Sequence, residues 1–218
     1  MSPCELVVFD WDGTLMDSAA RIVAAVQAGI EATGLPARED GTIRGIIGLG
    51  LDEAVARLYP DATPEARGRL VRSYRKSFVR AAAEQPADLF PGVRETLARL
   101  EDAGYLLGVA TGKSRSGLRR ELAESGIGGH FVATRTADEC GSKPHPRMLE
   151  ELIDFCGVTR DTTLMVGDTL FDLEMAANAR VDAVAVSWGV HEPESLEPHA
   201  SGGLIHSFDE LTRRLTGD

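Results

Sequence analysis

The stretch VVFDWDGTLMDS, residues 7–18, decides how the rest of the chain is interpreted. Its short apolar start, rich in Val and Phe, is typical of a buried β-strand. The strand ends in two carboxylates, Asp10 and Asp12, although Asp is unfavourable in strands and is rarely buried without a partner. Two acids so close together repel each other unless a cation or a proton lies between them. Because open α/β sheets bind ligands at the carboxyl ends of their strands, the pair indicates a binding site.

Strand and helix patterns alternate in the second part of the chain. Apolar runs predict strands over residues 105–111, 131–136, 163–168, 182–189 and 203–207. Helical patterns cover residues 93–104, 114–126, 146–157, 171–179 and 208–215. Such alternation is typical of right-handed βαβ units. We therefore expect an α/β fold, a mostly parallel sheet with helices on both faces.

The segment directly after the first strand is helical in pattern. Residues 18–34 are Ala-rich and periodic, with Ser18 as the expected N-cap and Gly34 as the stop. Residues 41–83 are also mostly helical in pattern, and turn residues gather at 85–92. We therefore predict an inserted all-α cap over residues 16–88, a core of residues 1–15 and 89–218, and hinges near 16–18 and 85–91.

Four short stretches fall at predicted strand ends or in the loops beside them. They are Asp10–Thr14, Ala110–Lys113, Ser142–Pro144 and Gly167–Asp172. In a parallel sheet all carboxyl ends lie on one edge, so these stretches are expected to converge. Together they supply acids, a hydroxyl, an ammonium and glycine-flanked amides, which suits an anion bound through a hard cation.

The composition of the chain limits which binding partners and which cellular location are expected. The 218 residues carry a formal net charge of −11, which argues against nucleic acid and anionic membranes as partners. There is no apolar run long enough to span a membrane. The three cysteines, Cys4, Cys140 and Cys156, form no C-x-x-C pair, which favours reduced thiols and a cytoplasmic location.

The four stretches, in this order, resemble the four motifs of the haloacid dehalogenase superfamily. The position of the cap resembles the helical-cap subfamily, and the resemblance implies a Rossmann-like core. It also implies that Asp10 is the nucleophile that forms an aspartyl-phosphate, and that Asp12 is the general acid and base. Lys143 would bridge Asp10 and the phosphate, and Thr111 would hydrogen-bond the phosphoryl group. Dehalogenases lack an acid at the position of Asp12, so its presence favours phosphate over halide.

The same resemblance implies a Mg²⁺ site and a substrate site. The metal ligands would be Asp10, the backbone carbonyl of Asp12, Asp168 and, directly or through water, Asp172. Backbone amides near Gly13 and Gly112 are expected to hold the phosphate, since glycine lets the backbone approach closely. Arg44, beside the glycine-containing stretch Gly45–Gly50, is a candidate for contact with the far end of the substrate, although a solvated arginine is an equal alternative.

These residues favour a Mg²⁺-dependent phosphatase acting on a small phosphorylated metabolite similar to phosphoglycolate. A phosphomutase and a pyrophosphatase of the same superfamily stay open as alternatives, and a phosphorylated receiver domain is the alternative from another class. We expect a monomer or a homodimer.

Two residues depart from the family pattern. Trp11 stands where Phe is more frequent, and its side chain is expected to point into the core, away from the acids. Arg180 replaces a frequent glycine, and Asn178 is expected to take the left-handed turn instead.

Overall fold

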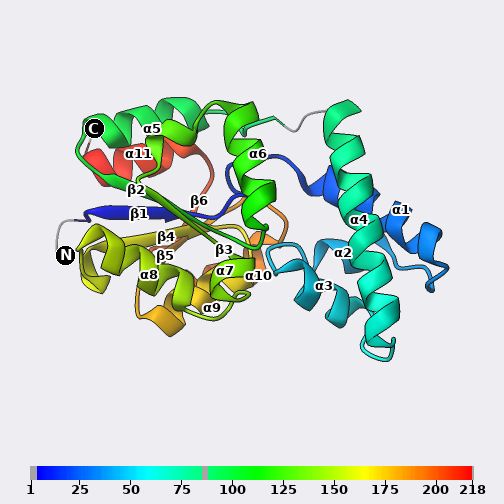
Figure 1. Ribbon diagram of the computed structural model, residues 1–218. Coiled ribbons are helices and arrows are strands. Elements are labelled where there is room, and N and C mark those ends of the chain that lie inside the picture. Colours follow the sequence, from blue (N-terminus) through cyan, green and yellow to red (C-terminus); the bar gives the residue numbers. More distant parts are fainter. Residues whose placement is uncertain (1–3, 85–87, 218) are drawn as a thin grey trace.

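The fold is built on a parallel six-stranded sheet, seen in a computed structural model that describes residues 4–84 and 88–217 (Figure 1). The strands are β1 (Leu6–Phe9), β2 (Leu106–Thr111), β3 (Ala133–Thr136), β4 (Thr163–Gly167), β5 (Asp182–Val186) and β6 (Leu204–Ile205). They lie in the order β3-β2-β1-β4-β5-β6, and every pairing is parallel. This order is Rossmann-like and confirms the predicted fold class.

Helices cover both faces of the sheet because residues along β1 point alternately to the two sides. Val7 and Phe9 pack with one core cluster, and Leu6 and Val8 pack with the other. The first face is covered by α5 (Val93–Asp102), α6 (Arg115–Ser125) and α11 (Phe208–Thr216). The second is covered by α8 (Arg147–Cys156), α9 (Leu170–Ala179) and α10 (Pro193–Leu196). Figure 1 shows these two helical layers above and below the sheet.

A helical cap stands beside the carboxyl ends of the strands (Figure 1). It consists of α1 (Ala19–Thr33), α2 (Asp40–Arg44), α3 (Leu51–Leu58) and α4 (Pro64–Glu84). Its apolar residues form a separate core cluster, including Ile22, Ile43 and Leu70. All four helices fall within the segment predicted as the cap.

The two connections between cap and core run side by side. The Asp17 amide donates a hydrogen bond to the Asp88 carbonyl at 2.9 Å, and the Phe90 amide donates one to the Leu15 carbonyl at 3.0 Å. The predicted hinge at 85–91 includes Gln85, Pro86 and Ala87, which lie outside the described residues. The boundaries at residues 16 and 88 stay a prediction.

The structure differs from the sequence predictions in three local features. Arg180, not Asn178, takes the left-handed conformation, with φ 57°, because α9 continues through Ala179. Ser18 precedes α1 without capping it through its side chain. The one-turn helices α7 (Ala137–Cys140) and α10 were not predicted, since four residues are too few to show a helical period.

Single 3₁₀ turns complete the structure at Gly128–His130, Arg160–Thr162 and Glu197–His199. Within the described ranges, none of the helices combines the length and the apolar character needed to cross a bilayer.

Candidate active site

Three aspartates meet where the chain leaves the neighbouring strands β1 and β4. Asp10 follows β1, Asp168 follows β4, and Asp172 lies in the first turn of α9. Each offers one carboxylate oxygen to a group in which these oxygens lie within 4.8 Å of one another. All three side chains are buried. The strand order reverses between these two strands, because the chain continues from β1 to β2 on one side and from β4 to β5 on the other. Rossmann-like sheets bind their ligands at this kind of reversal.

The acids differ in how their oxygens are engaged. Asp168 accepts hydrogen bonds from the Thr14 hydroxyl at 2.7 Å and from the Val190 amide at 2.8 Å. Asp172 accepts from Lys143 at 2.6 Å and, on its other oxygen, from the Thr169 hydroxyl at 2.7 Å. Within residues 4–84 and 88–217, by contrast, neither buried oxygen of Asp10 accepts a well-directed hydrogen bond.

The buried Lys143 ammonium is the cation closest to the cluster. It lies 2.6 Å from Asp10 and 2.6 Å from Asp172, and its exposed fraction is 1%. Burial alone would lower the pKa of Lys143, but the two carboxylates raise it above its usual range. Lys143 is therefore charged and holds the two acids together.

One lysine does not balance three carboxylates. Burial raises the pKa of Asp10 well above its usual value, against the attraction of Lys143 and with added repulsion from Asp172 and Asp168. Burial and then Asp172 raise the pKa of Asp168 to about 7. A divalent cation would compensate the two remaining negative charges, and the Asp10 oxygen that does not face Lys143 is open to it. The residues therefore fit a metal bound through oxygen ligands.

The Asp12 carboxylate is held apart from this group. It accepts a hydrogen bond from the Ser18 hydroxyl at 2.5 Å, and both of its oxygens lie 2.9 Å from the Lys113 ammonium. In the part of the chain that is described, the three-acid cluster does not include this side chain. That agrees with a role for its carbonyl, not its carboxylate, at the metal, which stays a prediction.

Two glycines let the backbone come close to other groups at this edge. Gly13 has φ +86°, and a Cβ atom there would lie 2.2 Å from an Asp168 oxygen. A Cβ atom on Gly112 would lie 2.5 Å from the carbonyl oxygens of Gly48 and Leu49, which belong to the cap. Larger residues at either position would displace the acid or the cap.

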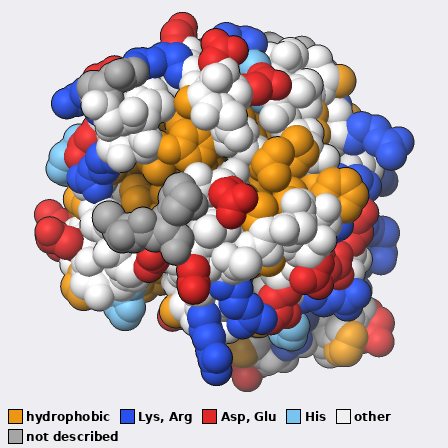
Figure 2. Space-filling model, turned by 90° about the vertical axis from the view of Figure 1, so that its left-hand side faces the viewer, with side chains coloured by type: hydrophobic (Ala, Val, Ile, Leu, Met, Phe, Trp, Pro, Cys, Tyr) orange, Lys and Arg blue, Asp and Glu red, His pale blue; other side chains and the backbone are white. Residues whose placement is uncertain are grey.

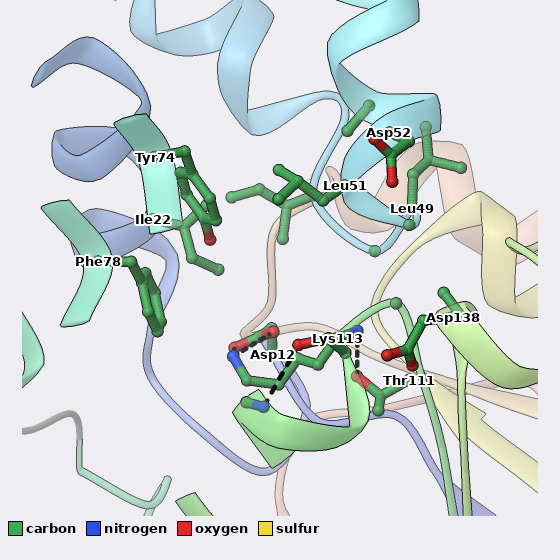
Figure 3. A pocket seen from close by; sticks show the side chains of 18 of the residues that line it. Asp12, Ile22, Leu49, Leu51, Asp52, Tyr74, Phe78, Thr111, Lys113 and Asp138 are labelled. Atoms are coloured by element: carbon green, nitrogen blue, oxygen red, sulfur yellow. Dashed lines mark hydrogen bonds and ion pairs between the residues drawn. The ribbon is translucent and has the colours of Figure 1, made fainter. Parts of the chain in front are cut away.

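A cavity of about 660 Å³ opens above these groups, between the cap and the core. Asp10, Asp12, Thr111 and Gly112 line its core side. Figure 3 shows Thr111 and the ion pair of Asp12 with Lys113 on one side of this space, and cap residues opposite. Arg44 is exposed and does not line the cavity, so the structure does not bring it to the site.

A buried ion-pair network behind Asp12 was not identified from the sequence. Glu121 on α6, which is 1% exposed, lies 3.2 Å from Lys113 and 2.7 Å from Arg21 of the cap helix α1. It also accepts a hydrogen bond from the Trp11 indole at 2.6 Å. Trp11 is fully buried in the core, as predicted. Its indole nitrogen, which Phe would lack, is one of the partners that satisfy Glu121.

Glu121→Gln should destabilise the protein substantially. The change keeps the shape but removes the negative charge that both Arg21 and Lys113 contact, so we expect a loss of about 3 kcal/mol in the free energy of unfolding. Urea denaturation measures it. The control is Glu150→Gln, which breaks the exposed pair with Arg160 at 3.3 Å and should have a much smaller effect. Equal losses in the two variants would show that the network does not stabilise the fold.

Comparison with known proteins places the chain in a family. It is 35% identical over 209 residues to "Probable phosphatase IndB" of Dickeya dadantii, covering 94% of this chain and 91% of that protein. It is 31% identical over 215 residues to the phosphoglycolate phosphatase of Mesorhizobium japonicum, covering 96% and 94%. The crystal structure of a hydrolase from Pseudomonas syringae superposes with a TM-score of 0.88 at 22% identity, covering 98% of each chain.

The fold and the site are those of a hydrolase. Residues 7–186 match the family of haloacid dehalogenase-like hydrolases, and the chain belongs to that family. The relatives named above make it a phosphatase within the family and exclude the receiver-domain alternative.

Proposed function

We propose that this phosphatase hydrolyses a phosphate monoester through an aspartyl-phosphate on Asp10, with Mg²⁺ as its metal. The main support for this proposal is the environment of the Asp10 carboxylate. It is buried and faces Lys143 at 2.6 Å, yet neither of its oxygens is held by a well-directed hydrogen bond from the described residues. A carboxylate that is paired with a cation through one oxygen and has its other oxygen without a partner in the described part of the chain is suited to nucleophilic attack on phosphorus.

Asp10 and Asp12 would carry out the two chemical steps of the reaction. An Asp10 oxygen attacks phosphorus, a new P–O bond forms, and the bond to the leaving alcohol breaks. For this step Asp12 must carry a proton, which it donates to the leaving oxygen. Asp12, now a carboxylate, takes a proton from water, whose oxygen attacks the same phosphorus and releases inorganic phosphate from Asp10. Both acids line the cavity, and Asp12 stands outside the three-acid cluster that includes Asp10, which supports giving them separate roles.

Other residues would hold the phosphoryl group. Lys143 balances the charge of Asp10 and of the phosphate, which would otherwise repel each other. The Thr111 hydroxyl lines the cavity and is suited to donate to a phosphoryl oxygen. The amides near Gly13 and Gly112 are the remaining candidate donors. Asp10, Asp168, Asp172 and the Asp12 carbonyl would hold Mg²⁺, which when bound would neutralise charge on the phosphoryl oxygens.

The partner would be a small phosphorylated metabolite, with phosphoglycolate, named for the relatives, as the reference compound. A net charge of −11 does not suit nucleic acid or anionic membranes. Figure 2 shows the face remote from the cap, where basic and acidic side chains are interspersed. All three cysteines are free, which supports a reducing, cytoplasmic location. We propose a monomer or a homodimer.

A phosphate-release assay tests the function. With Mg²⁺ present, the protein should release phosphate from monoesters, and an excess of chelator should abolish the release. Isomerisation of a sugar phosphate without phosphate release would instead support a mutase, and hydrolysis restricted to pyrophosphate would support a pyrophosphatase. Turnover that is indifferent to chelator would contradict the metal assignment.

Mg²⁺ should also raise the melting temperature, and by more at about pH 8 than at about pH 5.5. The folded pKa of Asp168 is raised to about 7, so metal-free stability falls as pH rises towards that value, as the carboxylates ionise. A bound metal ion relieves the repulsion between the ionised carboxylates. Below about pH 7 the metal must compete with protons for the same oxygens. Differential scanning fluorimetry with and without Mg²⁺ measures the shift. The Asp172→Asn variant should show a smaller shift than the native protein at both pH values.

A further inference from the structure

The cavity is larger than a phosphate and a two-carbon acid require. Its volume of about 660 Å³ lies within the ~300–1,000 Å³ range of pockets that enclose drug-sized ligands. Asp10, Asp12 and Thr111 occupy only its core side. Because the phosphoryl group must lie beside Asp10, the remaining space lies towards the cap and is available to the leaving alcohol.

The cap side of the cavity is mainly apolar. Ile22 comes from α1, Leu49 and Leu51 lie at the start of α3, and Phe78 comes from α4. Figure 3 shows them around the space opposite Asp12. This wall is held close to the core, since the Gly50 amide donates a hydrogen bond to the Ser142 hydroxyl at 2.8 Å. The wall would contact an apolar body better than a carboxylate.

The charges along the wall disfavour an anionic leaving group. Acidic side chains outnumber basic ones, since Asp52, Glu53 and Asp138 line the cavity in addition to Asp10 and Asp12. The basic residues are Lys113, Arg75 and Arg120. Lys113 is paired with Asp12 and Glu121, and Arg75 is exposed. Arg120 lies 3.8 Å from Glu124, and Glu53 is 3.4 Å from Arg57, so the acids of the wall that form no ion pair with a described residue are Asp52 and Asp138.

One polar group interrupts the apolar wall. The Tyr74 hydroxyl points into the cavity in Figure 3, and no described residue hydrogen-bonds to it. Tyr74 packs against Phe78, with ring centroids 5.5 Å apart, which fixes the direction of its ring. The hydroxyl can therefore donate to, or accept from, a polar atom on a bound ligand.

We propose that the preferred substrate is the phosphate monoester of a bulky, uncharged alcohol, with an apolar body against Leu51 and Phe78. This inference rests on the proposed phosphatase activity and narrows it. It favours a larger, neutral leaving group over the glycolate of the reference compound.

The test compares three alkyl esters: 2-phenylethyl phosphate, ethyl phosphate and 2-phosphoglycolate. Their leaving groups are all alkoxides, so differences in kcat/KM report mainly on binding of the leaving group. We expect kcat/KM for 2-phenylethyl phosphate to exceed that for each of the others by about tenfold or more. A value equal to or below that for 2-phosphoglycolate, with phosphate still released, would overturn this inference and leave the phosphatase proposal intact. No phosphate from any of the three would count against the phosphatase proposal itself.

The Leu51→Ala variant tests whether the apolar cap wall is the source of the preference for a bulky leaving group. Loss of the side chain from the wall should reduce the ratio of kcat/KM for 2-phenylethyl phosphate to that for ethyl phosphate by about fivefold. Val132→Ala, at a 47% exposed position outside the cavity, should leave the ratio unchanged. If Leu51→Ala keeps the ratio of the native protein, the apolar cap wall does not select the substrate and the inference is wrong.

Discussion

Asp10→Asn should reduce phosphate release by roughly 10⁴-fold or more, because loss of a nucleophile removes the covalent route. The amide has nearly the shape of the carboxylate but cannot attack phosphorus. The native structure gives a specific reason to expect the fold to survive. Burial, Asp168 and Asp172 all disfavour a charge on Asp10, so a neutral side chain removes repulsion and leaves Lys143 paired with Asp172.

Two measurements separate loss of chemistry from loss of structure. The melting temperature of the chelator-treated variant should be no lower than that of the chelator-treated native protein. After incubation with substrate, acid-quenched native protein should carry phosphate in an acyl linkage that hydroxylamine removes, whereas Asp10→Asn should carry none. Substantial activity in Asp10→Asn would exclude Asp10 as the nucleophile.

Lys143→Met should damage both stability and catalysis. Met keeps the length of the side chain, but it leaves Asp10 and Asp172 buried without their cation. Breaking a buried ion pair in this way costs about 3–5 kcal/mol, because the remaining charges stay desolvated. Urea denaturation in the presence of chelator measures this loss. We further expect kcat/KM to fall about 10³-fold, since the charge opposing the phosphate is lost.

The matched control is Arg147→Met, which removes a cation from the exposed pair with Glu151. Exposed pairs contribute little, so this variant should resemble the native protein in both assays. Saturating Mg²⁺ should restore part of the stability of Lys143→Met, because a cation bound among the same acids replaces some of the missing charge. A variant as stable as the native protein in chelator would mean that Lys143 does not hold the acids together.

Much of this architecture was predictable from local patterns. The apolar runs that end in Asp10 and Asp168 predict strands, and their alternation with helices predicts a parallel sheet whose carboxyl ends share one edge. That geometry brings Asp10, Lys143, Asp168 and Asp172 together, although up to 162 positions separate them in the chain. Arg44 was selected only from its place beside a glycine-containing stretch, and nothing in that pattern could show that its side chain points into solvent.

Sequence alone determined the class of fold, the inserted helical segment and the acids at the sheet edge, because backbone periodicity and strand direction are local properties. Tertiary packing decided which side chains meet across long separations. It brings Glu121 into contact with Trp11, Arg21 and Lys113. It also places the Asp12 carboxylate next to Ser18 and Lys113, and it positions the apolar residues of the cap over the site. These contacts depend on how the cap rests on the core, and no spacing along the chain encodes that orientation.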